Sequence, residues 1–254
     1  MVLDGAQLCA LCQPGRELRR HPETFESPMS THVERARLLI DLNRSTQAEE
    51  ELRRELAEQP ANVEAHSLLA RCLTEQKRYS EAQAELEEVV RLEPDCDYAK
   101  RLGGCVLREQ GRFQEAEAEA REAIRLEPED PAHYFLLSYV LSEQERWSES
   151  ANVAREGLRI DPEDPFIANV LINDLIEMNR NEEAQDILNV TMGKHPEEGM
   201  SHGNQGLIYL NQNKPVEALR HFREAVRLDP DNAELHKYIE KKFVEYLRTQ
   251  LKIK

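Results

Sequence analysis

The sequence predicts an all-α protein built as an array of stacked helix pairs, and two observations lead to that prediction. The first is a fixed period, because prolines recur every 34 residues at Pro60, Pro94, Pro128, Pro162, Pro196 and Pro230. The second is the spacing of apolar residues between those prolines, which is helical, as in residues 111–134. A period of this size is typical of a solenoid, in which each helix pair buries its apolar face against the next pair.

Each period is predicted to hold two helices joined by a tight turn. In the third period, the helices are expected near residues 98–110 and 113–126, with Gly111 between them. Asn43, Asn179 and Asn213 stand at the matching place in other periods, and Gly and Asn tolerate the left-handed conformation that ends a helix. The six units are expected at residues 29–62, 63–96, 97–130, 131–164, 165–198 and 199–232.

The boundaries between units carry the residue types that begin helices. A side-chain oxygen is available at the N-cap position in Asn62, Asp130, Asp164 and Asn232. Pro131 and Pro165 follow at the first helical position, where the missing N–H removes no hydrogen bond.

Small residues recur in pairs twelve positions apart, one in each helix of a unit. Facing small side chains let two antiparallel helices approach closely. The pairs are Ala36 and Ala48, Ala70 and Ala82, Gly104 and Ala116, Ser138 and Ser150, and Gly206 and Ala218. The fifth unit departs from this rule with Ile172 opposite Ala184, which predicts a wider helix pair or a locally altered stacking angle there.

These features together resemble the tetratricopeptide repeat, or TPR. The aromatic residues Tyr79, Phe113 and Trp147, each opening a second helix, add to the likeness. The resemblance covers residues 29–232 and implies a right-handed superhelix whose first helices line a concave groove. It also implies a non-enzymatic scaffold or adaptor that holds partner proteins.

Helical spacing along the first helices gives a candidate partner-binding set. Arginines come early in the chain, aromatic residues in the middle and amides late. The set is Arg37, Arg71, Tyr98, Arg101, Arg108, Phe135, Tyr139, Phe166, Asn169 and Asn173. Because arginine binds carboxylates bidentately and aromatic side chains are rigid anchors, we expect an acidic peptide with an apolar or aromatic anchor. The alternative is that these arginines pair with glutamates of neighbouring helices and the aromatic residues only fill the inner wall.

Composition limits the classes of partner and the compartment. Lys and Arg number 33 against 49 Asp and Glu, and a net charge of −16 argues against binding to duplex nucleic acid. Five scattered cysteines favour a reducing compartment. No apolar run approaches the ~20 residues of a membrane-spanning helix. The start of the sequence does not read as a signal peptide, so we expect a cytoplasmic protein.

No motif for catalysis, metal binding or a cofactor is found. The sequence lacks a glycine-rich phosphate loop, an HExxH motif and a nucleophile elbow. Cys9 and Cys12 form a CxxC, but no second pair follows at zinc-site spacing, so two ordinary thiols are expected. We therefore predict no enzyme, no metal and no cofactor.

The two ends of the sequence differ from the repeats. Residues 1–28 show no sustained period and are predicted to be a poorly ordered leader. Residues 233–254 form an amphipathic pattern with an apolar face that contains Leu235, Ile239 and Phe243, which predicts a helix that caps the last unit. The alternative is a basic amphipathic helix that touches an anionic membrane or serves complex assembly.

Overall fold

The computed structural model describes residues 31–194 and 199–251, and helices are the only regular secondary structure in these ranges. The thirteen helices of the described residues form six consecutive pairs followed by one last helix, as the sequence predicts. The pairs are α2 (Thr31–Asp41) with α3 (Ser45–Glu58), α4 (Val63–Glu75) with α5 (Tyr79–Leu92), α6 (Asp97–Glu109) with α7 (Phe113–Leu126), α8 (Pro131–Glu143) with α9 (Trp147–Ile160), α10 (Pro165–Glu177) with α11 (Asn181–Lys194), and α12 (Gly199–Asn211) with α13 (Pro215–Leu228). The last helix is α14 (Ala233–Leu251). The predicted leader lies outside the described residues.

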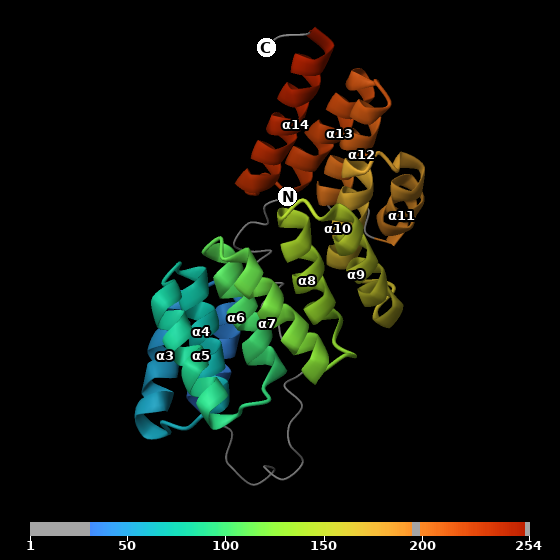
Figure 1. Cartoon of the computed structure of the whole chain (residues 1–254). Helices are drawn as coiled ribbons and strands as arrows, with labels where there is room; N and C mark the ends of the chain where they lie inside the picture. The colour runs from blue at the N-terminus through green and yellow to red at the C-terminus, as the bar shows by residue number, and fades with distance from the viewer. Residues whose placement is uncertain (1–30, 195–198, 252–254) are drawn as a thin grey trace. The chain divides into compact units, whose positions relative to one another are not determined.

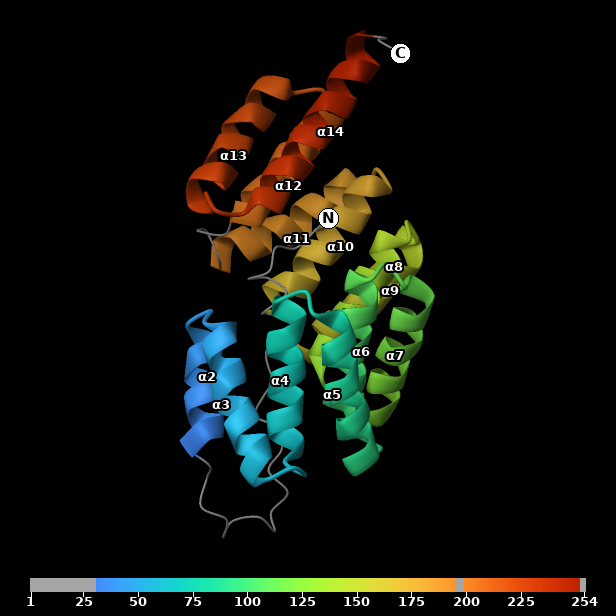
Figure 2. The same ribbon diagram turned by 90° about the vertical axis from the view of Figure 1, so that its left-hand side faces the viewer.

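The chain forms two compact units that divide within α8, between Leu136 and Leu137. In the N-terminal unit, each helix from α2 to α7 packs against the next, and the first helices α2, α4 and α6 also contact one another in turn (Figure 2). In the C-terminal unit, α9 to α13 pack in the same order, and α12 contacts both α10 and α14 (Figure 1).

Four of the six turns within the pairs have the backbone conformation that their residues predict. Asn43, Gly111, Asn179 and Asn213 all have positive φ angles. The two remaining turns place Lys77 (φ 61°) and Glu145 (φ 59°) in the same left-handed region. This conformation crowds the Cβ atom of an ordinary side chain, so these two turns are less favourable than the other four.

The N-caps also form as predicted. The side chain of Asn62 accepts a hydrogen bond from the backbone N–H of Ala65 at 3.1 Å, and Asn232 accepts one from Leu235 at 2.9 Å. The remaining two caps are aspartates, with hydrogen bonds from Ala132 to Asp130 at 2.9 Å and from Phe166 and Ile167 to Asp164 at 2.8 and 2.9 Å.

The residues of the small-residue pairs are all buried. Alanines of these pairs are fully buried, and Ser150 donates a hydrogen bond from its hydroxyl to the backbone carbonyl of Ser138 at 2.7 Å. A Cβ atom added to Gly104 would lie 2.8 Å from Leu136 and 3.3 Å from the carbonyl of Ala116. The width of the fifth pair, with Ile172, stays a prediction.

Helix α14 packs onto the sixth pair through its apolar face. Leu235 and Ile239 are buried, and a Cβ atom added to Gly203 of α12 would touch both side chains. The rings of Phe243 and Phe222 meet edge to face with centroids 6.4 Å apart. These contacts support the capping role, because they bury Leu235 and Ile239 at the start of the apolar face, whereas Leu247 near its end is exposed. None of the described helices has both the length and the apolar character required to cross a bilayer.

The neighbours Gly103 and Gly104 give a matched test of helix packing. Gly103→Ala should raise the free energy of unfolding by about 0.5–1 kcal/mol, because the new methyl group meets only Leu86, at 4.0 Å, and alanine favours the helix. Gly104→Leu should lower it by about 1–3 kcal/mol through overpacking. Urea unfolding of both variants measures this, and equal effects would contradict the small-residue account.

The turn at Glu145 gives a test of backbone strain. Glu145→Asn should raise the free energy of unfolding by about 0.5–1 kcal/mol, because asparagine tolerates the left-handed conformation better than glutamate does. Asparagine already occupies the matching position in three other turns. Urea unfolding next to the control Gln144→Asn, one residue earlier, checks the prediction, which fails if both variants shift stability alike.

Candidate partner-binding surface

Three arginines of the candidate set lie on two neighbouring first helices of the N-terminal unit. Arg71 comes from α4, and Arg101 and Arg108 come from α6. All three are nearly fully buried, with exposed fractions of 2%, 1% and 5%. Burial of a charged group is costly unless other groups compensate it, so these side chains are not ordinary surface arginines.

Acidic side chains lie beside two of these arginines, but on the same helix and not on a neighbouring helix as the alternative expectation had it. Arg71 pairs with Glu75 at 3.3 Å on its own helix, and Arg108 pairs with the adjacent Glu109. Arg37 of α2, which is half-exposed, pairs with Glu64 of α4. The ion pairs therefore neutralise part of this positive face and hold the guanidinium groups in place.

Arg101 is positioned by an aromatic ring. Its guanidinium carbon lies 5.0 Å from the centroid of the Tyr98 ring, one turn earlier on α6, which is a cation–π contact. Tyr98 is itself buried. Phe135, at the register of Arg101 on the next first helix, is also buried. The N-terminal unit thus holds Arg37, Arg71, Tyr98, Arg101, Arg108 and Phe135 of the candidate set.

The amides of the candidate set lie in the C-terminal unit and are engaged within it. The side chain of Asn204 donates a hydrogen bond to Asn169 Oδ1 at 2.9 Å. The hydroxyl of Tyr238, on α14, donates to Asn173 Oδ1 at 2.6 Å. Both amides connect helices of this unit, which is a structural role that sequence spacing did not reveal. Tyr139 is buried in the same unit, and Phe166 is half-buried.

A cleft that the sequence did not predict opens between α10, α12 and α14 of the C-terminal unit. Its apolar wall includes Leu207 and Leu210, and its polar rim includes Glu177, Lys242 and Tyr246. Lys242 forms an ion pair with Glu177 at 2.5 Å, and Tyr246 donates a hydrogen bond to Asn213 at 2.6 Å. The capping helix therefore supplies one wall of a polar-rimmed hollow.

A buried carboxyl group was also missed by sequence reasoning. Asp174 of α10 is fully buried, and the preceding and following repeats carry Val140 and Ile208 at the same position. Its Oδ1 accepts a hydrogen bond from Ser142 at 2.7 Å, whereas Oδ2 has no hydrogen-bond partner in the described structure. Burial raises the pKa of Asp174 to about 7, despite hydrogen bonds that act in the opposite direction.

Family models agree on what the repeats are. Three models described as tetratricopeptide repeat match residues 39–103, 101–165 and 200–232. No curated protein matches the sequence.

Solved structures with the same fold are distant in sequence. PilF from Pseudomonas aeruginosa is 18% identical over 83% of this chain and 96% of its own, with a TM-score of 0.66. YrrB, described as a TPR protein with an unusual peptide-binding site, is 17% identical over 75% of this chain and 97% of its own, with a TM-score of 0.54. A chain of the APC/C hetero-tetramer Cut9–Hcn1 is 15% identical over 94% of this chain and 46% of its own, with a TM-score of 0.74. At these identities the likeness shows the fold alone.

The raised pKa of Asp174 predicts a pH-dependent contribution to stability. In the folded chain the carboxyl titrates near pH 7, and in the unfolded chain near pH ~3.9. The folded state therefore holds the extra proton between these values. Ionisation of Asp174 makes the free energy of unfolding fall as pH rises from about 4 to about 7.

Asp174→Asn should remove this fall, so that the variant gains stability over the wild type as pH rises through that interval. Urea unfolding at several pH values from 4 to 8 measures the difference. The control Asp186→Asn, at an exposed position of α11, should show no such gain. A constant difference between Asp174→Asn and wild type would contradict the buried-carboxyl account.

Proposed function

This chain belongs to the tetratricopeptide repeat family, and on that premise we propose that it is a scaffold that binds a protein segment on the first helices of its N-terminal unit. The segment carries a carboxylate beside an apolar or aromatic anchor. The family is a general protein–protein interaction scaffold and is typically non-enzymatic, and we propose no catalytic role. The cytoplasmic location and the absence of nucleic-acid binding stay predictions.

The buried arginines of α4 and α6 are the observation that carries this proposal. Other units carry smaller or uncharged residues at the same registers, including Ser67 for Arg101 and Thr74 for Arg108. The fold thus does not require arginine at either place. Because replacing a buried ion pair by apolar residues is often neutral or stabilising, stability alone does not explain these side chains.

The chemistry of these arginines favours a carboxylate ligand. A guanidinium group binds a carboxylate through two parallel hydrogen bonds, and its planar geometry fixes the direction of approach. The pairing of Arg71 with Glu75 and of Arg108 with Glu109 shows which anion these positions already accept. In the complex, a carboxylate of the partner takes the place of the glutamate beside the arginine, so the arginine keeps one negatively charged neighbour.

The aromatic residues beside the arginines supply the second half of the recognition. Tyr98 lies against Arg101, and Phe135 occupies the register of Arg101 on the next first helix. Rigid aromatic side chains lose little conformational entropy on binding and are enriched among residues that dominate interface energies. A peptide with an apolar or aromatic residue next to an acidic one therefore fits this set of residues best.

Selection of a phage-displayed random peptide library on the full chain tests the proposed ligand class. We expect selected peptides to carry an acidic residue next to an apolar or aromatic one. Arg101→Lys keeps the positive charge but loses the two parallel N–H groups that bind a carboxylate, so it should weaken peptide binding about tenfold or more. Phe135→Leu should weaken binding as well.

Affinity capture with mass spectrometry extends the test to natural partners. It compares the wild type with the variant that carries both Arg101→Lys and Phe135→Leu.

Two controls keep this test specific to the proposed surface. Arg121→Glu changes an exposed arginine of α7, which pairs with Glu117 at 2.8 Å, and should leave binding unchanged. Tyr246→Ala alters the cleft of the C-terminal unit and should also leave it unchanged. Unchanged binding in folded Arg101→Lys and Phe135→Leu variants, or loss only in Tyr246→Ala, overturns the proposal.

A further inference from the structure

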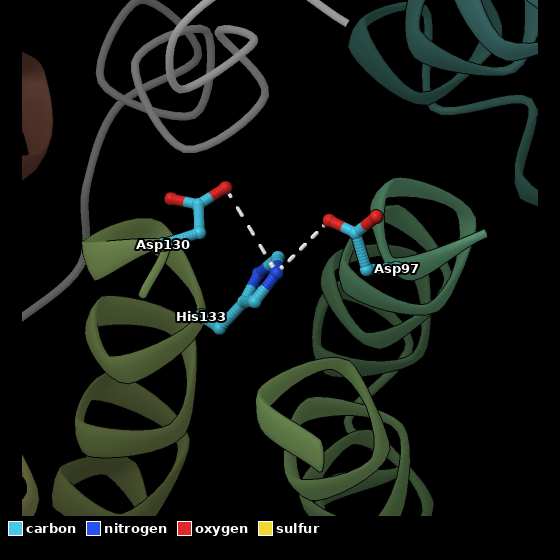
Figure 3. Close-up of side chains that lie close together, drawn as sticks. All are labelled: Asp97, Asp130 and His133. Carbon is cyan, nitrogen blue, oxygen red and sulfur yellow. Dashed lines mark hydrogen bonds and ion pairs between the residues drawn. The ribbon is translucent and has the colours of Figure 1, made fainter. Parts of the chain in front are cut away.

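Three side chains with metal-binding atoms meet in the N-terminal unit: Asp97, Asp130 and His133 (Figure 3). The two carboxylates point toward the imidazole from opposite sides. His133 Nε2 lies 3.0 Å from Asp97 Oδ2 and 3.9 Å from Asp130 Oδ2. One donor atom from each residue can be chosen so that all three lie within 4.8 Å of one another.

The repeat places these residues together although 36 positions separate Asp97 from His133. Asp97 is the first residue of α6, and His133 lies in the first turn of α8. Asp130 is the N-cap of α8, where its Oδ1 accepts the hydrogen bond from Ala132 at 2.9 Å. Stacking of successive units brings the start of one first helix next to the start of the following one.

His133 and Asp97 both depart from the repeat. At the register of His133, other units carry Ala65, Ala99, Ile167, Ser201 and Leu235. At the register of Asp97, they carry Val63, Pro131, Pro165 and Gly199. An imidazole and a carboxylate thus replace small or apolar residues at two registers that meet across neighbouring units. Packing of the repeat does not account for this coupled change.

The electrostatics of the cluster leave more negative charge than the imidazole can neutralise. The His133 side chain is fully buried, and its Nε2 is directed between the two carboxylates (Figure 3). A single N–H at Nε2 reaches Asp97, whereas Asp130 Oδ2 lies beyond hydrogen-bond distance. Nδ1 has no hydrogen-bond partner in the described structure, so no second contact fixes the tautomer.

We propose that Asp97, Asp130 and His133 form a site for a divalent transition-metal ion of the zinc type. In that state Nε2 is deprotonated and binds the ion together with one oxygen from each carboxylate. Zinc accepts nitrogen and carboxylate ligands at about 2.0–2.2 Å, so inward shifts of the side chains complete the set. An imidazole ligand favours zinc over magnesium or calcium.

The surroundings of the site are consistent with this ion. The hydrogen bond from Ala132 fixes the Asp130 carboxylate, as outer-sphere contacts do for metal ligands. Arg101 exerts a positive potential on Asp97, and the second carboxylate, Asp130, adds negative charge to the site. Three protein ligands leave the remaining coordination positions to water.

Zinc titration of the full chain by isothermal calorimetry, in buffer free of chelators, tests the proposal. We expect a zinc ion whose binding weakens at least about tenfold in Asp97→Asn and is lost in His133→Ala. Alanine occupies the His133 register in two other units, so this variant retains a side chain that the repeat already accommodates. Magnesium should show no His133-dependent binding.

The control His66→Ala removes a buried histidine whose two nitrogens already contact Glu85 and the carbonyl of Pro60, and it should leave zinc binding unchanged. Two other places in the chain offer competing ligands: Cys9 with Cys12, and His202 with His221, whose Nδ1 atoms lie 3.2 Å apart. The titration is therefore repeated in a Cys9→Ser/Cys12→Ser background and in His221→Ala.

Retention of a His133-dependent zinc ion in both backgrounds supports the site. Cobalt substitution gives an independent readout, because nitrogen and oxygen ligands produce visible bands without the near-ultraviolet charge transfer of a thiolate. Zinc binding that persists in His133→Ala, that disappears in either competing background, or that is absent from wild type overturns the proposal. In those cases the three side chains form an ion pair only.

Discussion

The fold depends on one packing constraint: a single helix pair cannot cover its own apolar face, so every pair must fit the next one in the same register. Fully buried small residues meet that constraint. A Cβ atom added to Gly104 would lie 3.3 Å from the carbonyl of Ala116, which shows how little space remains at one such contact. The constraint acts every 34 residues, which is why it is visible in the sequence. A residue whose type differs from those at the same position of the other repeats, and whose side chain does not improve the packing, therefore needs another explanation.

Features that depend on neighbours in the chain were predictable. The left-handed turns at Gly and Asn, the four side-chain N-caps and the apolar face of α14 follow from local residue chemistry, and the structure confirms them. The left-handed conformation of Lys77 and Glu145 did not follow from their residue types. Features that arise where unusual residues of different repeats come into contact were not predictable from the sequence. Asn173 and Tyr238 are 65 residues apart, and their hydrogen bond depends on how α14 packs. The burial of Asp174 likewise depends on neighbouring helices, although a carboxylate at an otherwise apolar register was a signal that the sequence contained.

The sequence proposed the candidate binding residues, and the structure shows only where their side chains lie. Sequence spacing identified an arginine-rich stretch of first helices, and the structure places Arg71, Arg101 and Arg108 close to acidic or aromatic neighbours within one unit. Spacing alone could not show how deeply these side chains are buried, because burial is set by several helices at once. It also assigned binding roles to Asn169 and Asn173, whose hydrogen bonds connect helices of the C-terminal unit. The hydrogen bonds of Asn169 and Asn173 hold helices together, whereas the binding role of the arginines stays a prediction.

The central claim is that a partner carboxylate binds on α4 and α6. Hydrogen–deuterium exchange of the full chain, with and without a selected acidic peptide, tests it most directly because it reports where binding slows amide exchange. The account predicts added protection in residues 63–75 and 97–109, and its loss in Arg101→Lys at the same peptide concentration. Protection confined to α10, α12 and α14, with no change in those two helices, would contradict it.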